Sequence, residues 1–176
     1  MKTCITILSL ALLLFCAVAA SPRDGFSGVT CGSDIPKALI GRVMPNERVA
    51  VTESRHKDLG LKDLGGTEIS DRLFCASWRI CGNEYMWLQD SHNVVRDVLT
   101  FPEHSKRWPE FIGECQNNGK KVSGQIVAIL DNEEGKDTLS AKVAWKIDEK
   151  GAKFIKVPTD GLRCPRDGII TTDGGR

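Results

Sequence analysis

The chain has 176 residues, and its 24 lysine and arginine residues against 23 aspartate and glutamate residues give a formal net charge of +1 at pH 7. This balance creates no strong global field, which argues against a protein that is drawn to nucleic acid or to an anionic membrane surface. We therefore expect no nucleic-acid partner.

The first twenty residues have the pattern of a secretory signal peptide. Lys2 supplies a positive charge, residues 5–18 form an apolar run, and small residues occupy positions 17–20. A bilayer requires about 20 apolar residues, and the polar stretch at residues 21–24 ends the run before that length. We expect a cleaved signal peptide over residues 1–20, secretion to the extracellular space and no membrane span.

Removal of this segment leaves a chain of the size of one domain. We expect a flexible segment over residues 21–30, one β-rich domain over residues 31–167, and a flexible tail over residues 168–176.

Turn signals divide the domain into short apolar segments. One short helix is expected within residues 33–43, where Ser33 or Asp34 caps it and Pro36 occupies its first turn. The remaining pattern predicts β-strands, which in chain order lie at residues 48–53, 72–81, 85–89, 94–99, 110–115, 126–130, 139–148 and 152–157. Hairpin turns are expected at residues 90–93 and 148–151. Alternation in residues 139–148 places Leu139, Ala141, Val143, Trp145 and Ile147 on one face. About eight short strands at this spacing predict an all-β, mainly antiparallel sandwich or barrel.

The segment KDLGLKDLGG, at residues 57–66, repeats a five-residue unit and resembles a phosphate-binding loop that lacks its lysine. The following residues form a strand pattern rather than the helix that such a loop requires. We instead predict two successive turns, each ending in a glycine, that direct Leu59, Leu61 and Leu64 into the core.

Five cysteines remain after removal of the leader: Cys31, Cys75, Cys81, Cys115 and Cys164. Secretion favours disulfides, and an odd number leaves one thiol unpaired. Cys75 and Cys81 lie on one strand, about 20 Å apart, so they cannot pair with each other. Fifteen arrangements are possible, of which we favour Cys31–Cys164 and Cys81–Cys115. Cys75 is then the spare thiol, which is buried or, as an alternative, forms an intermolecular bridge.

The sequence contains no recognisable catalytic or metal-binding motif. The G-x-S-x-G and H-E-x-x-H patterns are absent, no C-x-x-C occurs, and the three histidines show no ligand spacing. We expect no cofactor and no metal.

One polar cluster is nevertheless a candidate for catalysis. Glu53, Arg55 and His56 lie at the end of the strand predicted at residues 48–53 and just after it, and His104 can supply a second imidazole. A carboxylate, a guanidinium and an imidazole are the groups of a metal-independent hydrolase that acts on RNA or a glycan. The alternative is a charged strand end that enters a polar loop.

Three aromatic residues are candidates for binding. Tyr85 and Trp87 share one face of a predicted strand, and Trp108 follows a basic loop. Exposed together, these rings could stack on a sugar or contact a protein partner, whereas core or edge packing is the alternative.

A leader, one compact β-domain, a few cysteines and the lack of a catalytic motif make the chain resemble the small secreted cysteine-containing proteins of filamentous fungi, many of which are effectors. The resemblance implies a protein that acts outside the secreting cell on a host molecule. We expect a monomer that binds an extracellular or host protein or a glycan. A secreted hydrolase that uses Glu53, Arg55 and His56 is the alternative.

Overall fold

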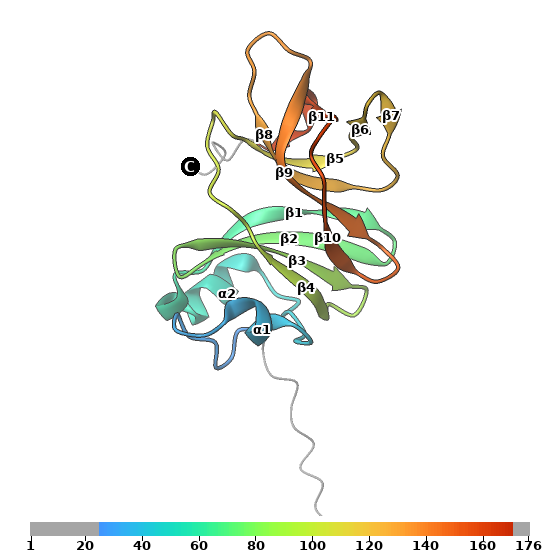
Figure 1. Cartoon of the computed structure of the whole chain (residues 1–176). Coiled ribbons are helices and arrows are strands. Elements are labelled where there is room, and N and C mark those ends of the chain that lie inside the picture. Colours follow the sequence, from blue (N-terminus) through green and yellow to red (C-terminus); the bar gives the residue numbers. More distant parts are fainter. Residues whose placement is uncertain (1–24, 171–176) are drawn as a thin grey trace, which may run out of the picture.

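A computed structural model describes residues 25–170, so the predicted signal peptide and most of the predicted tail lie outside the described residues. Within this range two antiparallel β-sheets pack against each other, and two short α-helices lie beneath the first sheet (Figure 1). The prediction of a mainly antiparallel all-β sandwich is confirmed.

The packed region extends beyond both predicted domain limits. Phe26 and Val29 are buried in the core ahead of Cys31. At the other end, the short strand Ile169–Ile170 pairs with Glu110 and Phe111. The N-terminal segment therefore contributes core side chains.

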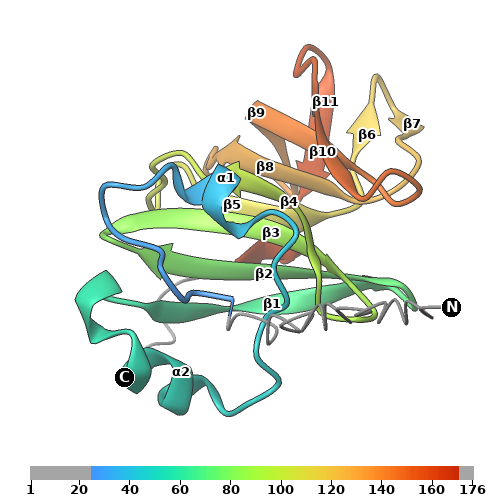
Figure 2. The same cartoon turned by 90° about the horizontal axis from the view of Figure 1, so that it is seen from below.

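The first sheet contains four strands in the order β1-β2-β3-β4, each paired with its neighbour in sequence. Their bounds are β1 Lys62–Ser70, β2 Leu73–Ile80, β3 Asn83–Asp90 and β4 Val95–Thr100. The helices α1 (Ile35–Leu39) and α2 (Val49–Arg55) and the 3-10 turn η1 (Lys57–Leu59) precede it, as Figure 2 shows from below. None of the helices in the described range is long and apolar enough to cross a membrane.

The second sheet follows the order β12-β5-β8-β9-β11-β6-β7, and β10 pairs with the free part of β9. Its strands are β5 Glu110–Gly113, β6 Gln116–Asn117, β7 Lys120–Lys121, β8 Ile126–Asp131, β9 Thr138–Asp148, β10 Lys153–Val157, β11 Leu162–Pro165 and β12 Ile169–Ile170, with the 3-10 turn η2 at Arg166–Gly168. The predicted hairpins at β3–β4 and β9–β10 are both present.

Alternation of side chains divides the core into layers. On β3, Tyr85 and Trp87 face the helices, where Trp87 stacks on Trp78 with ring centroids 6.0 Å apart. Met86 and Leu88 face the opposite way, toward the second sheet. Because neighbouring residues of a strand point to opposite faces, β2, β3 and β4 each contribute side chains to both hydrophobic layers.

The long strand β9 contains an irregularity that the sequence pattern does not reveal. Ile129 pairs with Val143 but Leu130 pairs with Ala141, so Lys142 is an extra residue opposite β8. A bulge of this kind reverses the faces on its two sides. Ala141 therefore packs in the outer layer of the second sheet while Val143 packs toward the first, although the sequence placed them on one face.

The disulfides differ from the predicted pairing. Cys31 is bonded to Cys81 and Cys115 to Cys164, so both predicted pairs are wrong, although the same four cysteines are used. The prediction assumed that the chain ends meet. Instead, the N-terminal segment packs on the first sheet beside the β2–β3 turn, and the second bridge closes within the second sheet.

Cys75 is the free cysteine of the described chain, as predicted, and it is buried between the sheets. Burial, and secondarily the negative charge of Glu110, raise the pKa of its thiol to about 12. A bond to another chain would require this layer to open.

The helix predicted near residue 33 is confirmed, with Asp34 accepting a hydrogen bond from the Lys37 amide at 3.3 Å. The strand predicted at residues 48–53 is wrong, because this segment forms α2. Val49 and Val51, whose alternation suggested a strand, are both exposed, while Thr52 is buried.

The two KDLG copies adopt different structures. The first ends in Gly60, whose left-handed conformation closes η1 and leaves Leu59 buried. The second lies within β1, where a bulge falls between Asp63 and Gly65. A Cβ on Gly66 would lie 2.7 Å from the backbone oxygen of Cys75, so the second copy is a strand that needs glycine for close packing.

We expect Gly66→Ala to lower the free energy of unfolding by about 2 kcal/mol, because the added methyl group collides with backbone that cannot rotate away. Gly32→Ala is the matched control, since nothing lies within 4 Å of its Cβ position. Urea denaturation measures both variants, and equal midpoints would contradict the assigned role of Gly66.

Candidate functional site

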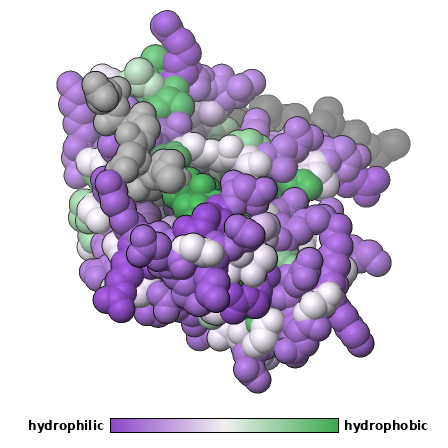
Figure 3. Space-filling model, turned by 90° about the horizontal axis from the view of Figure 1, so that it is seen from above, coloured by the Kyte–Doolittle hydropathy of each residue, from purple (hydrophilic) through white to green (hydrophobic). Residues whose placement is uncertain are grey.

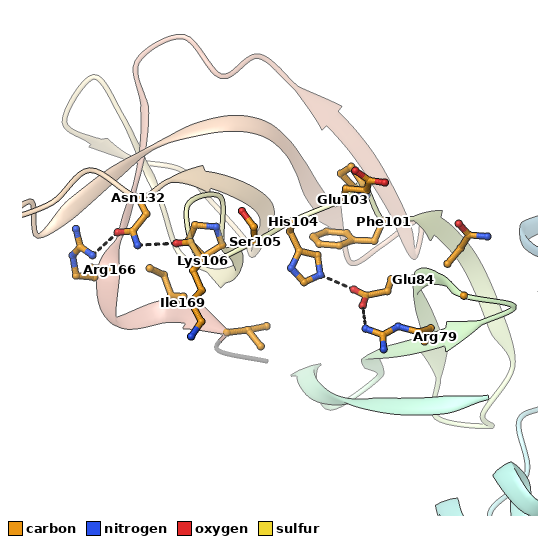
Figure 4. A pocket seen from close by; sticks show the side chains of 15 residues that line it. Arg79, Glu84, Phe101, Glu103, His104, Ser105, Lys106, Asn132, Arg166 and Ile169 are labelled. Atoms are coloured by element: carbon orange, nitrogen blue, oxygen red, sulfur yellow. Dashed lines mark hydrogen bonds and ion pairs between the residues drawn. The ribbon is translucent and has the colours of Figure 1, made fainter. Parts of the chain in front are cut away.

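A pocket of about 970 Å³ opens at one end of the molecule between the two sheets. Arg79 and Glu84 reach it from β2 and β3, and His104 from the segment that joins the sheets (Figure 4). On the side of the second sheet, Asn132 reaches it from the β8–β9 loop and Arg166 from η2. Both layers of the fold and the connection between them therefore contribute to this pocket.

The connecting segment, residues 101–109, is held in place at both ends. Phe101 is buried, and its amide donates to the Glu84 carbonyl at 2.8 Å. Ser105 and Trp108 exchange two backbone hydrogen bonds of 2.9 Å, which form a tight turn. The His104 ring packs edge-on against Phe101, with centroids 5.6 Å apart, so the imidazole has a fixed position in the pocket.

Arg79 and Glu84 are opposite each other across the β2–β3 hairpin. The Arg79 guanidinium donates to Oε1 of Glu84 at 2.5 Å, and Oε2 of Glu84 lies 2.6 Å from Nε2 of His104. Desolvation acts to raise the pKa of Glu84, but the hydrogen bonds and charges of Arg79 and His104 outweigh it and lower that pKa. Glu84 is therefore a carboxylate at neutral pH.

Glu110, the first residue of β5, lies behind His104. Its side chain is 6% exposed, and its carboxylate is 4.0 Å from Nε2 of His104. Burial is the main cause that raises the pKa of Glu110 to about 7; the charge of His104 acts against this rise and that of Glu84 adds to it. Two carboxyl groups with separated pKa values thus flank one imidazole, which is an arrangement suited to proton transfer or to cation binding.

The opposite wall of the pocket is a rigid network around Arg166. Its guanidinium donates to Oδ1 of Asn132 and to the carbonyl of Lys136, each at 2.6 Å. Asn132 in turn donates to the Lys106 carbonyl at 2.9 Å. These bonds connect η2, the β8–β9 loop and the joining segment, so this wall has a defined shape.

The structure gives Glu53, Arg55 and His56 separate contacts. Glu53 accepts from the Asp63 amide at 2.9 Å, Arg55 forms a bidentate pair with Glu47, and His56 packs on Phe26 with ring centroids 5.6 Å apart. Glu53 and His56 thus have structural contacts of their own. Hydrolysis by these three residues stays a prediction, and their separate contacts do not favour it.

Of the predicted residues, His104 is the one that lines the large pocket. Tyr85 and Trp87 are buried against the helices, so they do not form an exposed surface with Trp108. Trp108 is partly exposed, and the ammonium group of Lys142, the bulge residue of β9, lies 3.9 Å from its ring centroid.

Sequence reasoning missed Arg79, Glu84 and Glu110. The segment RICGNEY contains a two-residue turn in which Cys81 and Gly82 both have positive φ, and recognising it as a hairpin would have paired Arg79 with Glu84. Nothing local distinguishes Glu110, an acidic residue at the start of an apolar strand.

Comparison with known proteins gives no relative: no protein family, no curated protein and no solved structure matches this chain.

Proposed function

We propose that this chain is a secreted, disulfide-stabilised β-domain that acts outside the cell by binding, and that its ligand occupies the pocket between the two sheets. The main support is the pocket itself, in which the hydrogen-bonded Arg79, Glu84 and His104 converge. The resemblance to fungal effector-type proteins suggests that the ligand belongs to a host.

A short oligosaccharide is the ligand class that we propose. The volume of about 970 Å³ is at the upper end of the range for small-ligand pockets, roughly 300–1,000 Å³. Charged and amide groups alternate in the lining with apolar residues such as Phe101 and Ile169. Sugars present hydroxyl groups and apolar ring faces together, so a lining of this mixed kind suits them.

The surface around the second sheet supports a polar ligand as well. Seen from above, this face is mainly hydrophilic, and its hydrophobic residues are confined to small areas (Figure 3). Stable protein interfaces usually have a central apolar region, and a large one is not visible on this face. Insertion of one segment of a host protein into the pocket is the competing outcome of the test.

The test is binding of the labelled, purified protein to an array of glycans, followed by titration of each ligand found. We expect saturable binding that weakens at least tenfold in Arg79→Ala, since this change removes the partner that orients Glu84. Arg55→Ala, which alters a guanidinium on α2 outside this pocket, is the matched control and keeps wild-type affinity. Absence of saturable glycan binding, or equal affinity of Arg79→Ala and wild type, would overturn the proposal.

A further inference from the structure

Three potential metal ligands converge beside the pocket, and each comes from a different element. They are Glu84 of β3, His104 of the joining segment and Glu110 of β5, and one ligand atom from each lies within 4.8 Å of the other two. Tetrahedral coordination with bonds of 2.0–2.2 Å places ligand atoms about 3.4 Å apart. Nε2 of His104 lies 2.6 Å from Oε2 of Glu84 and 4.0 Å from Oε2 of Glu110. One distance is shorter and the other longer than the tetrahedral value, so small side-chain movements would bring the three atoms to coordination geometry.

Glu110 provides an independent indication of a bound cation. Its side chain is 6% exposed, and its carboxylate lies 4.0 Å from Nε2 of His104, which is longer than a hydrogen bond. That nitrogen already has Glu84 as a partner at 2.6 Å. Burial of an ionised carboxylate is costly, and a cation between the three groups would offset that cost.

The surroundings also suit a metal site. Arg79 donates to Oε1 of Glu84, which leaves Oε2 directed at His104, and Phe101 packs on the imidazole. Groups that orient ligands from outside the coordination shell are a regular part of metal centres. Glu84 and His104 also line the pocket, so a coordination position faces the space where a ligand can enter.

From this geometry we propose that Glu84, His104 and Glu110 bind one divalent transition-metal ion of the Zn²⁺ type, with an open position toward the pocket. One imidazole and two carboxylates match such an ion, whereas Ca²⁺ and Mg²⁺ prefer oxygen ligands alone. The inference rests on the proposed function in one respect: an oxygen of the pocket ligand completes the coordination.

The experiment is calorimetric titration of the purified, EDTA-treated protein with Zn²⁺, and with Co²⁺ to record its absorption spectrum. We expect one equivalent of Zn²⁺ to bind, with Ca²⁺ and Mg²⁺ far weaker. His104→Ala, Glu84→Gln and Glu110→Gln each weaken binding by more than the roughly 10- to 100-fold that loss of an outer-shell partner causes.

Matched controls exclude adventitious binding. His92→Ala removes an exposed histidine in the β3–β4 turn, and Glu103→Gln removes an exposed carboxylate at the pocket rim; both keep wild-type Zn²⁺ affinity. Circular dichroism verifies folding, and the three ligand variants report on one site, so a single unstable variant does not prevent a decision. Failure of the wild type to bind Zn²⁺, or wild-type affinity in the folded ligand variants, would overturn the inference.

The two proposals can fail separately. If glycan binding persists in EDTA and no Zn²⁺ binds, the metal site is wrong and the ligand pocket stands. If Zn²⁺ binds with one equivalent and the variants abolish it, while no glycan binds, the metal site stands and the proposed ligand is wrong.

Discussion

Replacement of both Cys115 and Cys164 by serine lowers the free energy of unfolding by about 4 kcal/mol, the value that the chain-entropy model gives for a loop of this length. The bridge spans a sequence separation of 49 residues. Both cysteines are buried among Phe111, Leu130 and Leu162. Serine hydroxyl groups at these positions would lose solvation in the same layer, which adds to the loss.

Guanidinium denaturation of the oxidised wild type and the double variant measures this difference. The Cys31→Ser/Cys81→Ser variant is the comparison, because its bridge closes a loop of nearly the same length, with a separation of 50 residues, but Cys31 is exposed. The free energy of unfolding of this variant should decrease by a similar amount through loop entropy. The further decrease through the burial of serine hydroxyl groups should be smaller. Peptide mapping that finds Cys31 bonded to Cys164, or a loss below about 1 kcal/mol, would contradict this account.

In metal-free protein, Glu110 makes stability fall as the pH rises from about 4.5 to about 7. Burial raises the folded-state pKa of this carboxyl to about 7 from 4.5. As the pH rises, the unfolded state therefore releases its proton first and is stabilised relative to the folded state. The full change is roughly 3 kcal/mol at 1.36 kcal/mol per pKa unit. The favourable contribution is complete below pH 4.5 and is lost once the pH passes 7.

Glu110→Gln removes this dependence, because the amide does not titrate. We expect the stability of the variant relative to wild type to increase by roughly 3 kcal/mol between pH 4 and pH 8, as measured by urea denaturation in EDTA. Glu103→Gln changes an exposed carboxylate seven positions earlier in the sequence, and its stability should show the same pH dependence as that of the wild type. Parallel curves for Glu110→Gln would show that the carboxyl group is not buried as described.

Local pattern predicted the parts of the fold that local chemistry decides. The strand at β9, the β3–β4 hairpin and the Asp34 cap of α1 are all present, because each depends on neighbouring residues. The strand predicted at residues 48–53 is wrong because that prediction also used local pattern alone. Val49 and Val51 alternate as in a strand, but no strand pairs with them. Pairing is a long-range property that alternation does not contain.

The disulfides and the site depend on how the two sheets meet, which is also long-range information. Each cysteine bonds to a partner about fifty residues away within its own layer, and residue spacing cannot select that partner. The candidate site combines Glu84, His104 and Glu110. The sequence pattern drew attention to a carboxylate, a guanidinium and an imidazole at neighbouring positions, which lie at the end of α2. The candidate site combines the same kinds of group from residues far apart in the chain.

The central claim is that the pocket between the sheets is the functional site, and nuclear magnetic resonance of the ¹⁵N-labelled protein tests it most directly. On titration with the best ligand of the glycan array, we predict that the largest amide shift changes occur at Glu84, at His104 and along residues 101–109. The Arg79→Ala variant should show markedly smaller changes at the same ligand concentration. Changes concentrated instead on α2, around Arg55 and His56, would contradict the account and return the site to the helix.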